Sequence, residues 1–432
     1  MKKIASYALG CKVNQYESEA IAELFAEKGY EVVSVDDEAD VYIINTCTVT
    51  NFGDKKSRQL IRKVKRQNEN AIVAVVGCYA QTAPEELAAV HGVNLVIGTK
   101  DKSKIVELVE DYQAEQGVQN YVTDIMHERV FEPLEIKKLA NRTRAYLKIQ
   151  DGCSQFCSYC IIPYARGPIR SRQPEDVIAE VKRLAENGFK EVVLTGIHVA
   201  SYGKDLKTIT LTDIIRQVHE VEGIERIRFS SIEPNVVTEE FAAAMAELPK
   251  VCDHFHLSLQ SGCDKTLKEM NRKYDTEKYR QAAALLRKYL PDVAITTDII
   301  VGFPGETEED YQASRAFAEE IGFSKIHVFP YSPKKGTPAA ARKDKLQNAV
   351  KQARSHDLIT VSDRMTDAFL QKHVGKVMPV LFERCIGDDV YEGHTTNYMK
   401  VHARSTKDLS NVIADTKILS VAEEMAFGEV EA

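Results

Sequence analysis

The sequence predicts an α/β protein with an N-terminal parallel βαβ domain, a central partial (β/α) barrel and a C-terminal small β-barrel. Three observations support this prediction. Short apolar strands alternate with amphipathic helices over residues 1–117, and the alternation resumes over 141–368. Between them, 118–140 lose the periodicity and gain charge. From 371 to 432 only short β-like runs follow. Alternating strands and helices indicate parallel sheets covered by helices, and a series of short strands indicates a small barrel.

The N-terminal domain is expected to end near residue 117 and to be joined by a linker over 118–140. Because helices separate its strands, the strands should run parallel and end at one edge of the sheet. The expected strands are Lys3–Leu9, Val41–Asn45, Ala71–Val76 and Leu95–Ile97, and the expected helices are Glu17–Lys28, Asp54–Gln67 and Pro84–Val90.

The central domain, 141–368, carries more strand patterns than the first, which is typical of a partial α/β barrel rather than an open sheet. Its expected strands are Ala145–Ile149, Glu191–Thr195, Arg226–Phe229, His254–Ser258, Ala294–Ile300 and Lys325–Phe329. The tail, 371–432, is expected to form its barrel from runs such as Val377–Phe382, Tyr398–Ala403 and Ser410–Ala414.

The composition is typical of a soluble globular protein. Hydrophobic residues make up 44% of the 432 residues, and the net charge is −7. The apolar runs fall short of the ~18 residues that a membrane helix needs. Lys2 and Lys3 precede an apolar run that resembles a lipoprotein signal, but the run is too short, and Ser6 and Tyr7 interrupt it. We therefore expect a cytoplasmic protein with no membrane partner.

The nine cysteines are expected to be thiols or metal ligands, because disulfides are rare in cytosolic proteins. Three of them, Cys153, Cys157 and Cys160, form a CxxxCxxC loop after strand Ala145–Ile149. Three thiolates would leave one iron of a [4Fe–4S] cluster free for another ligand. The alternative is a zinc loop with a distant fourth ligand, since structural zinc sites usually close with four.

Three further cysteines each follow an expected strand of the N-terminal domain: Cys11, Cys47 and Cys78. Parallel strands place their carboxyl ends at one edge of the sheet, so the three thiols are expected to converge and to hold a second cluster. The alternative is that each is a small buried core residue, which is common for a free cysteine.

Together these features resemble the radical S-adenosylmethionine (SAM) methylthiotransferase family over nearly the whole chain. The Cys153–Cys160 loop, with its aromatic residue before the last cysteine, resembles the radical SAM signature. The other matching stretches are Leu9–Gln15, Asn45–Thr50, Gly77–Gln81 and Ile161–Gly167. The tail resembles an RNA-binding barrel of the TRAM type. The set of motifs is specific, although no single motif is.

The resemblance implies two [4Fe–4S] clusters and SAM as cofactors, with the six cysteines as catalytic and metal-binding residues. The Cys153–Cys160 loop would hold the SAM-binding cluster that generates a radical. Cys11, Cys47 and Cys78 would hold an auxiliary cluster that carries the inserted sulfur. One SAM molecule would supply the methyl group and another the radical. An electron donor and a sulfur donor are further expected partners.

The resemblance also implies which residues bind SAM. They are Tyr159, Thr195, Gly196, Ser258, Gln260 and Gly302. Gly302 belongs to the turn Asp298–Thr307, whose alternative role is an ordinary strand-to-helix turn, because the glutamates that follow favour a helix N-terminus. His198 lies near the same edge and is expected to be a hydrogen-bonded or surface histidine.

The expected macromolecular partner is tRNA, although the net charge is negative. Basic residues gather in helix Asp54–Gln67, which suits phosphate contacts, and a solvated helix face is the alternative. The tail has seven basic and ten acidic residues, so RNA binding there rests on the resemblance alone. Other candidate contacts are Lys137, Lys138, Arg142, Arg144 and Lys148 before the barrel, Arg166, Arg170 and Arg172 after the cysteine loop, and Lys400, His402 and Arg404 in the tail.

The sequence context of the first cysteine predicts the substrate. The segments Gly10–Gln15 and Gly393–Val401 resemble the group that converts N6-threonylcarbamoyladenosine, next to the anticodon, to its 2-methylthio form. One of the arginines after the cysteine loop would then pair with the threonylcarbamoyl carboxylate. The alternatives are a methylthiotransferase acting on isopentenyl-adenosine tRNA or on a ribosomal protein side chain, and a metal-containing RNA-binding module without enzyme activity.

Overall fold

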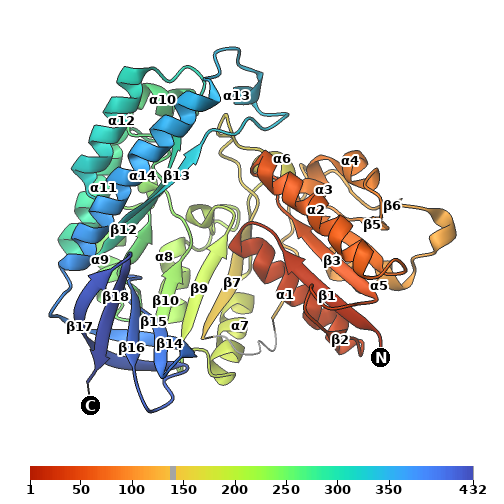
Figure 1. Ribbon diagram of the computed structural model, residues 1–432, viewed down its shortest axis with the longest axis horizontal. Coiled ribbons are helices and arrows are strands. Elements are labelled where there is room, and N and C mark those ends of the chain that lie inside the picture. The colour runs from red at the N-terminus through yellow and green to blue at the C-terminus, as the bar shows by residue number, and fades with distance from the viewer. Residues whose placement is uncertain (137–142, 432) are drawn as a thin grey trace.

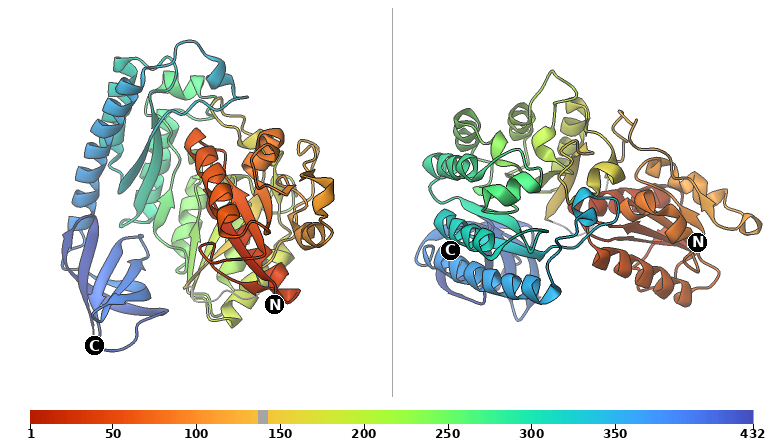
Figure 2. Two further views of the ribbon diagram at one scale, coloured as in Figure 1. Left: turned by 45° about the vertical axis from the view of Figure 1, so that its right-hand side comes forward. Right: turned by 90° about the horizontal axis from the view of Figure 1, so that it is seen from above.

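The computed structural model describes residues 1–136 and 143–431, which fold into the three expected units. Figure 1 shows an N-terminal α/β domain, a central barrel and a small β-barrel at the end of a long helix. Figure 2 shows the N-terminal domain on one side of the central barrel and the small barrel beyond the end of the long helix. The predicted fold class is therefore confirmed. Lys137, Lys138 and Arg142 lie outside the described residues.

The N-terminal domain is built on a six-stranded parallel sheet in the order β2-β1-β3-β4-β5-β6. The last strand, β6, comes from residues expected to be a linker, because two residues are too few to show a periodic pattern. The strands are β1 Lys3–Ala8, β2 Glu31–Val32, β3 Val41–Thr46, β4 Ile72–Gly77, β5 Leu95–Val96 and β6 Gln119–Asn120.

Helices cover both faces of this sheet. Phe25 of α1 packs with Ile105 of α5 on one face, and Ile61 of α2 packs with Leu87 of α4 on the other. Helix α1 begins at Lys12, five residues before the predicted start at Glu17, and Cys11 is its N-cap residue. The helices are α1 Lys12–Glu27, α2 Asn51–Gln67, α3 Cys78–Thr82, α4 Pro84–Ala88 and α5 Ile105–Glu110, with the 3₁₀ turns η1 Lys102–Lys104 and η2 Ala114–Gln116.

The central domain is a partial barrel made of two sheets, β10-β9-β7-β8 and β11-β12-β13. All pairs are parallel except the short β7–β8 pair, and isolated bridges such as Ile227–Val251 link β10 to the segment that leads into β11. The strands are β7 Arg144–Asp151, β8 Arg170–Ser171, β9 Glu191–Gly196, β10 Arg226–Phe229, β11 His254–His256, β12 Ala294–Val301 and β13 Lys325–Pro330.

The helices of the central domain pack outside the barrel and bury one continuous apolar core. Thr210 and Thr307 form capping boxes that fix the starts of α8 and α12. The helices are α6 Ile162–Arg166, α7 Pro174–Glu186, α8 Leu211–His219, α9 Glu239–Glu247, α10 Asp264–Glu269, α11 Thr276–Tyr289, α12 Glu308–Ile321, α13 Pro338–Ala341 and α14 Asn348–Gln371, with the 3₁₀ turns η3 Val199–Ser201 and η4 Pro234–Val236.

The tail forms a closed barrel in the order β14-β15-β16-β18-β17. It packs closely against the central domain. Buried Arg226 donates to the backbone oxygens of Pro379 and His394, each at 2.8 Å, and buried Arg228 donates to that of Thr396 at 3.0 Å. The small barrel therefore covers two cations of strand β10. Its strands are β14 Val377–Gly387, β15 Val390–Thr395, β16 Lys400–Arg404, β17 Val412–Ala422 and β18 Met425–Val430.

Among the described residues, the structure contains no helix with the length and apolarity needed to span a membrane.

Candidate active site

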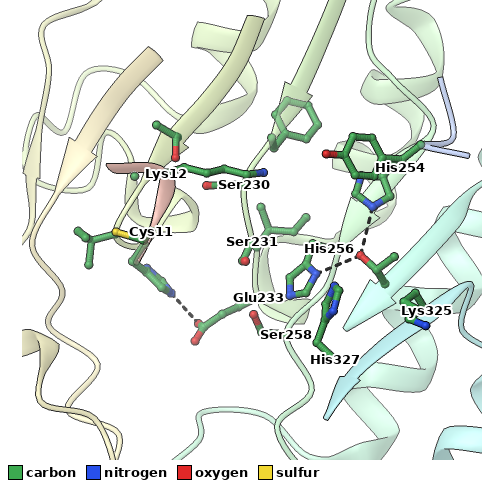
Figure 3. Close-up of a pocket in the computed structure, with 18 of the residues that line it drawn as sticks. Cys11, Lys12, Ser230, Ser231, Glu233, His254, His256, Ser258, Lys325 and His327 are labelled. Atoms are coloured by element: carbon green, nitrogen blue, oxygen red, sulfur yellow. Dashed lines mark hydrogen bonds and ion pairs between the residues drawn. The ribbon is translucent and has the colours of Figure 1, made fainter. Parts of the chain in front are cut away.

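A cavity of about 990 Å³ lies where the three units meet. Its wall includes Lys12 from the N-terminal domain, His256 and Lys325 from the barrel strands, and Tyr398 from the tail. Figure 3 shows Cys11 and Lys12 on one side of this cavity and Lys325 and His327 on the other. Ligand cavities usually have volumes of about 300–1,000 Å³. The cavity is therefore large enough for a cofactor together with part of a substrate.

The CxxxCxxC loop opens onto this cavity at the carboxyl end of β7. Cys153, Cys157 and Cys160 all belong to the cavity wall. The loop is held by the backbone nitrogen of Ser158, which donates to the oxygen of Met270 at 2.9 Å. Burial raises the pKa of Cys153 to about 11 and that of Cys160 to about 12. Iron binding at these positions must therefore release thiol protons.

Arg272 is a functional candidate that the sequence did not reveal. Its Nη1 donates to Sγ of Cys157 at 3.2 Å, and its Nη2 donates to Glu233 at 2.8 Å. Glu233 also lies 3.1 Å from Nε2 of His198, whose Nδ1 contacts Ser201 at 2.6 Å. His198 is thus a hydrogen-bonded histidine on the cavity wall. Donors to cluster sulfur are a means by which proteins tune an iron–sulfur centre, so Arg272 fits that role.

Cys11, Cys47 and Cys78 follow three neighbouring strands, β1, β3 and β4, at their shared carboxyl edge. The three thiols are close enough for each pair to interact electrostatically. Burial raises the pKa of Cys47 to about 12, and the neighbouring Cys78 raises it further. Cys11 reaches the cavity wall, whereas Cys47 and Cys78 lie behind it.

Gly10 allows this convergence. It has φ +93°, and a Cβ built on it would lie 2.6 Å from both Cβ and Sγ of Cys47. No side chain fits between the two loops, so glycine is required both for the backbone conformation and for the close approach of Cys47.

Arg166 connects the N-terminal cysteine group to the end of strand β7. Its Nε donates to Sγ of Cys78 at 3.3 Å, while its Nη1 donates to Glu17 at 2.6 Å and to Asp151 at 3.3 Å. Lys148 also donates to Glu17 and Asp151, at 2.7 Å each. Burial alone would raise the pKa of Glu17, but Arg166 and the neighbouring lysines hold it well below its usual range.

This network corrects the expected roles of several basic residues. Arg166, Arg170 and Arg172 are 0%, 3% and 2% exposed, so none is available to an RNA phosphate or a substrate carboxylate. Arg170 lies 3.5 Å from Asp151, and Arg172 pairs with buried Glu180. The expectation that these arginines contact RNA or substrate was wrong because their acidic partners lie elsewhere in the sequence. Glu17, for example, is 149 residues from Arg166. Two other residues expected to contact RNA are also unavailable to it. Lys148 is buried, and Arg144 pairs with Glu191 and Glu383.

Of the residues expected to bind SAM, four line the cavity: Tyr159, Thr195, Gly196 and Ser258.

The other two, Gln260 and Gly302, do not belong to the cavity wall. The backbone nitrogen of Gln260 donates to Asp298 at 2.8 Å, which ties it into the second sheet. The nitrogen of Gly302 donates to the carboxylate of Glu306 at 2.9 Å, and a Cβ on Gly302 would meet Lys351 of α14 at 2.3 Å. Gly302 thus forms a strand-to-helix turn that faces α14.

Both cysteine groups fit iron–sulfur clusters. One presents three thiols from a single loop after β7, the other presents three thiols at the carboxyl ends of β1, β3 and β4, and each receives one arginine donor at sulfur. Within the described part of the chain, no three His, Cys, Asp or Glu side chains are already grouped around one point for a metal ion. A cubane cluster does not require such a point, because each thiolate binds a different iron.

The basic residues of α2 remain available for RNA. Lys55, Lys56, Arg62, Lys63 and Arg66 are exposed, and Val49, just before the helix, lines the cavity. In the tail, Arg404 is exposed, Lys400 lies 3.2 Å from Glu392, and His402 contacts the same carboxylate at 3.1 Å.

A partial barrel of parallel strands with a CxxxCxxC loop at the end of its first strand defines a radical SAM enzyme. Two family models agree with this architecture: Radical SAM superfamily matches residues 147–318, and Uncharacterized protein family UPF0004 matches residues 3–98. Among solved structures, the radical SAM methyltransferase TsrM from Kitasatospora setae aligns with a TM-score of 0.57 at 16% identity, covering 79% of this chain and 77% of that one. This likeness shows the fold.

Relatives match the chain along nearly its full length. Threonylcarbamoyladenosine tRNA methylthiotransferase MtaB of Bacillus subtilis (strain 168) is 45% identical, covering 97% of this chain and 94% of the relative. The MtaB of Aquifex aeolicus (strain VF5) is 39% identical, with coverages of 95% and 99%. A tRNA-2-methylthio-N(6)-dimethylallyladenosine synthase of Thermoanaerobacter sp. (strain X514) is 37% identical, with coverages of 98% and 91%. The chain belongs to the family of radical SAM tRNA methylthiotransferases.

Proposed function

We propose that this enzyme adds a methylthio group to C2 of N6-threonylcarbamoyladenosine, next to the anticodon of tRNA, with SAM as the source of both the methyl group and the radical. Three relatives named for threonylcarbamoyladenosine are 35–45% identical over nearly the whole chain. The Bacillus subtilis protein is more similar to this chain than the Thermoanaerobacter dimethylallyladenosine synthase is.

The observation that carries the proposal is the single cavity shared by the two cysteine groups. The whole Cys153–Cys160 triad and Cys11 of the other group reach the same wall. Insertion of sulfur at an unactivated carbon requires radical formation and sulfur delivery at one bound base. Holding the reacting groups in one site lowers the entropic cost of bringing them together.

We assign SAM and one [4Fe–4S] cluster to the Cys153–Cys160 loop and a second cluster to Cys11, Cys47 and Cys78. When bound, the first group supplies the radical that removes hydrogen from the base, and the second supplies sulfur. The chain's own residues position these groups. Arg272 donates to Cys157, Arg166 donates to Cys78, and Tyr159 lies on the wall beside the loop.

The tail contributes to the wall where a base would enter. The ring of Tyr398 stacks against the rings of His254 and His394, with centroids 4.8 and 4.9 Å away. Arg228 lies over the Tyr398 ring at 4.6 Å. Because the tail closes the cavity in this way, we propose that it positions the anticodon loop, while the exposed basic face of α2 contacts phosphates. We expect this reaction to require an electron donor and a sulfur donor, and we expect an enzyme that modifies tRNA to work in the cytoplasm.

The lining of the cavity favours the threonylcarbamoyl over the isopentenyl substrate. Lys12, Lys325, His256 and His327 all belong to the wall. The threonylcarbamoyl group carries a carboxylate and a hydroxyl that such residues can pair with, whereas an apolar isopentenyl group would leave Lys12, which forms no ion pair with a described residue, desolvated and unpaired.

The direct test uses anaerobically reconstituted enzyme, SAM and a reductant with tRNA bearing either modification. Nucleoside mass spectrometry is expected to detect the 2-methylthio form of threonylcarbamoyladenosine and no product from isopentenyl-adenosine. Product from the isopentenyl form alone would overturn the substrate assignment. SAM cleavage without product on either tRNA would favour a protein substrate.

A further inference from the structure

Lys12 is a cation on the cavity wall that the interactions described so far do not use. Four lysine or arginine side chains line the cavity. Arg272 pairs with Glu233, Lys325 with Asp363 and Glu424, and Lys400 with Glu392. Lys12 forms no ion pair with a described residue, and its Nζ lies 5.7 Å from the centre of the Tyr146 ring.

The charges around Lys12 do not balance its ammonium group. The cations that influence it are Arg144 and Arg228, and the nearby acid is Glu191. Arg228 lies 3.0 Å from Glu191, and Arg144 lies 2.9 Å from Glu383. Each carboxylate therefore already has an arginine partner, and one positive charge remains at Lys12. A half-buried cation of this kind favours an anionic ligand.

Two further features of this wall suit an anion. Lys12 is the first residue of α1, a helix of 16 residues without an acid in its first turn, so the positive end of the helix dipole lies here. Ser230 lies on the same wall, and its buried hydroxyl has no hydrogen-bond partner within the described structure. Figure 3 shows Lys12 pointing into the cavity, with Ser230 drawn on the same upper side.

We propose that Lys12, assisted by the Ser230 hydroxyl, binds the carboxylate of the threonylcarbamoyl group and thereby determines the choice of substrate. The inference rests on the proposed function and deepens it. Lys12 follows Cys11 directly, so the same short segment that would supply sulfur also binds the modification on the base. An ammonium–carboxylate contact is a charge-assisted interaction, which is stronger than a hydrogen bond between neutral groups. A neutral modification leaves Lys12 unpaired, which disfavours its binding.

The test compares two anticodon stem-loop RNAs, one bearing threonylcarbamoyladenosine and one bearing its methyl ester, which lacks the charge and is larger by one methyl group. The wild-type enzyme is expected to prefer the acid in kcat/KM by about tenfold to a hundredfold. Lys12→Met and Lys12→Gln are expected to bring the acid-to-ester ratio close to one, mainly by raising KM for the acid. Lys12→Arg is expected to retain a preference for the acid, and Ser230→Ala to reduce it in part.

Lys400→Met is the matched control, because Lys400 lies on the same wall but is paired with Glu392. Any loss of RNA affinity in this variant affects both substrates, so its acid-to-ester ratio should stay at the wild-type value. Iron content and SAM cleavage without RNA identify variants with intact clusters. The inference is wrong if a neutral Lys12 variant with full iron keeps the wild-type ratio, or if the wild-type enzyme modifies acid and ester equally. Failure of the wild-type enzyme to modify either RNA would instead refute the proposed function.

Discussion

The Nε of Arg166 lies 3.3 Å from Sγ of Cys78, although the two residues belong to different domains. Arg166 ends α6, directly after the radical SAM cysteine loop, and Cys78 begins α3 of the N-terminal domain. The same guanidinium binds Glu17 of α1 and Asp151 at the end of β7. One fully buried side chain therefore fixes the position of the auxiliary cysteine group relative to the radical site.

Replacement of this side chain tests its importance. In Arg166→Gln, buried Glu17 and Asp151 lose a cation, and Cys78 loses its donor. Breaking a buried ion pair typically costs about 3–5 kcal/mol, so we expect a clear drop in the unfolding temperature and loss of iron from the auxiliary site. Thermal denaturation and iron analysis measure these effects. Arg62→Gln, at an exposed position of α2, serves as the control and should change neither. An Arg166→Gln enzyme with wild-type stability and iron content would contradict this role.

The close contact between Gly10 and Cys47 gives a sharper prediction. In Gly10→Ala the new methyl group would overlap Cys47, so the auxiliary cluster should fail to assemble while SAM cleavage at the other site continues. Gly29→Ala is the matched control, because Gly29 has a similar φ of +85° but no atom within 4 Å of its built Cβ. Iron analysis and deoxyadenosine formation distinguish the two variants. Equal iron content in both would show that the approach of Cys47 to Gly10 does not matter for the cluster.

The sequence predicted that Cys11, Cys47 and Cys78 lie together, because each follows a strand and strand order brings the three to one edge of the sheet. It predicted the other group from the spacing of three cysteines within one loop. It did not predict the partners of the arginines. Arg166 lies 149 residues from Glu17, and Arg272 lies 115 residues from Cys157. A local sequence pattern cannot predict contacts between such distant residues. The sequence therefore did not indicate that Arg166 is buried rather than exposed to RNA.

Short elements were missed for a different reason. Strands β2 and β6 have two residues each, which is too few to show alternation. The unpaired state of Lys12 was also invisible in the sequence, because it depends on which acids from other domains already have partners. Sequence patterns thus identified the two groups of cysteines, and the structure was needed to find the residues that surround them.

The exposed basic face of α2 is expected to contact tRNA phosphates. Lys55→Gln combined with Arg62→Gln should lower tRNA affinity and reduce the slope of log affinity against log salt by about one to two. Binding titrations over a range of salt concentrations measure both quantities. Lys28→Gln combined with Lys182→Gln removes the same charge from exposed positions at the end of α1 and on α7 and should leave the slope unchanged. If both double variants weaken binding equally, only the overall charge matters and α2 is not a specific contact.

The central claim is that one cluster forms the radical and a second cluster supplies the sulfur. The triple variant Cys11→Ala, Cys47→Ala and Cys78→Ala tests this claim directly. The measurement is iron content, deoxyadenosine formation and methylthiolated nucleoside on one preparation of reconstituted enzyme. We expect about half the iron of the wild-type enzyme, continued SAM cleavage and no methylthio product, because the Cys153–Cys160 site remains intact. Unchanged iron with normal methylthiolation would show that the three cysteines are ordinary core thiols, and the two-cluster account would be wrong.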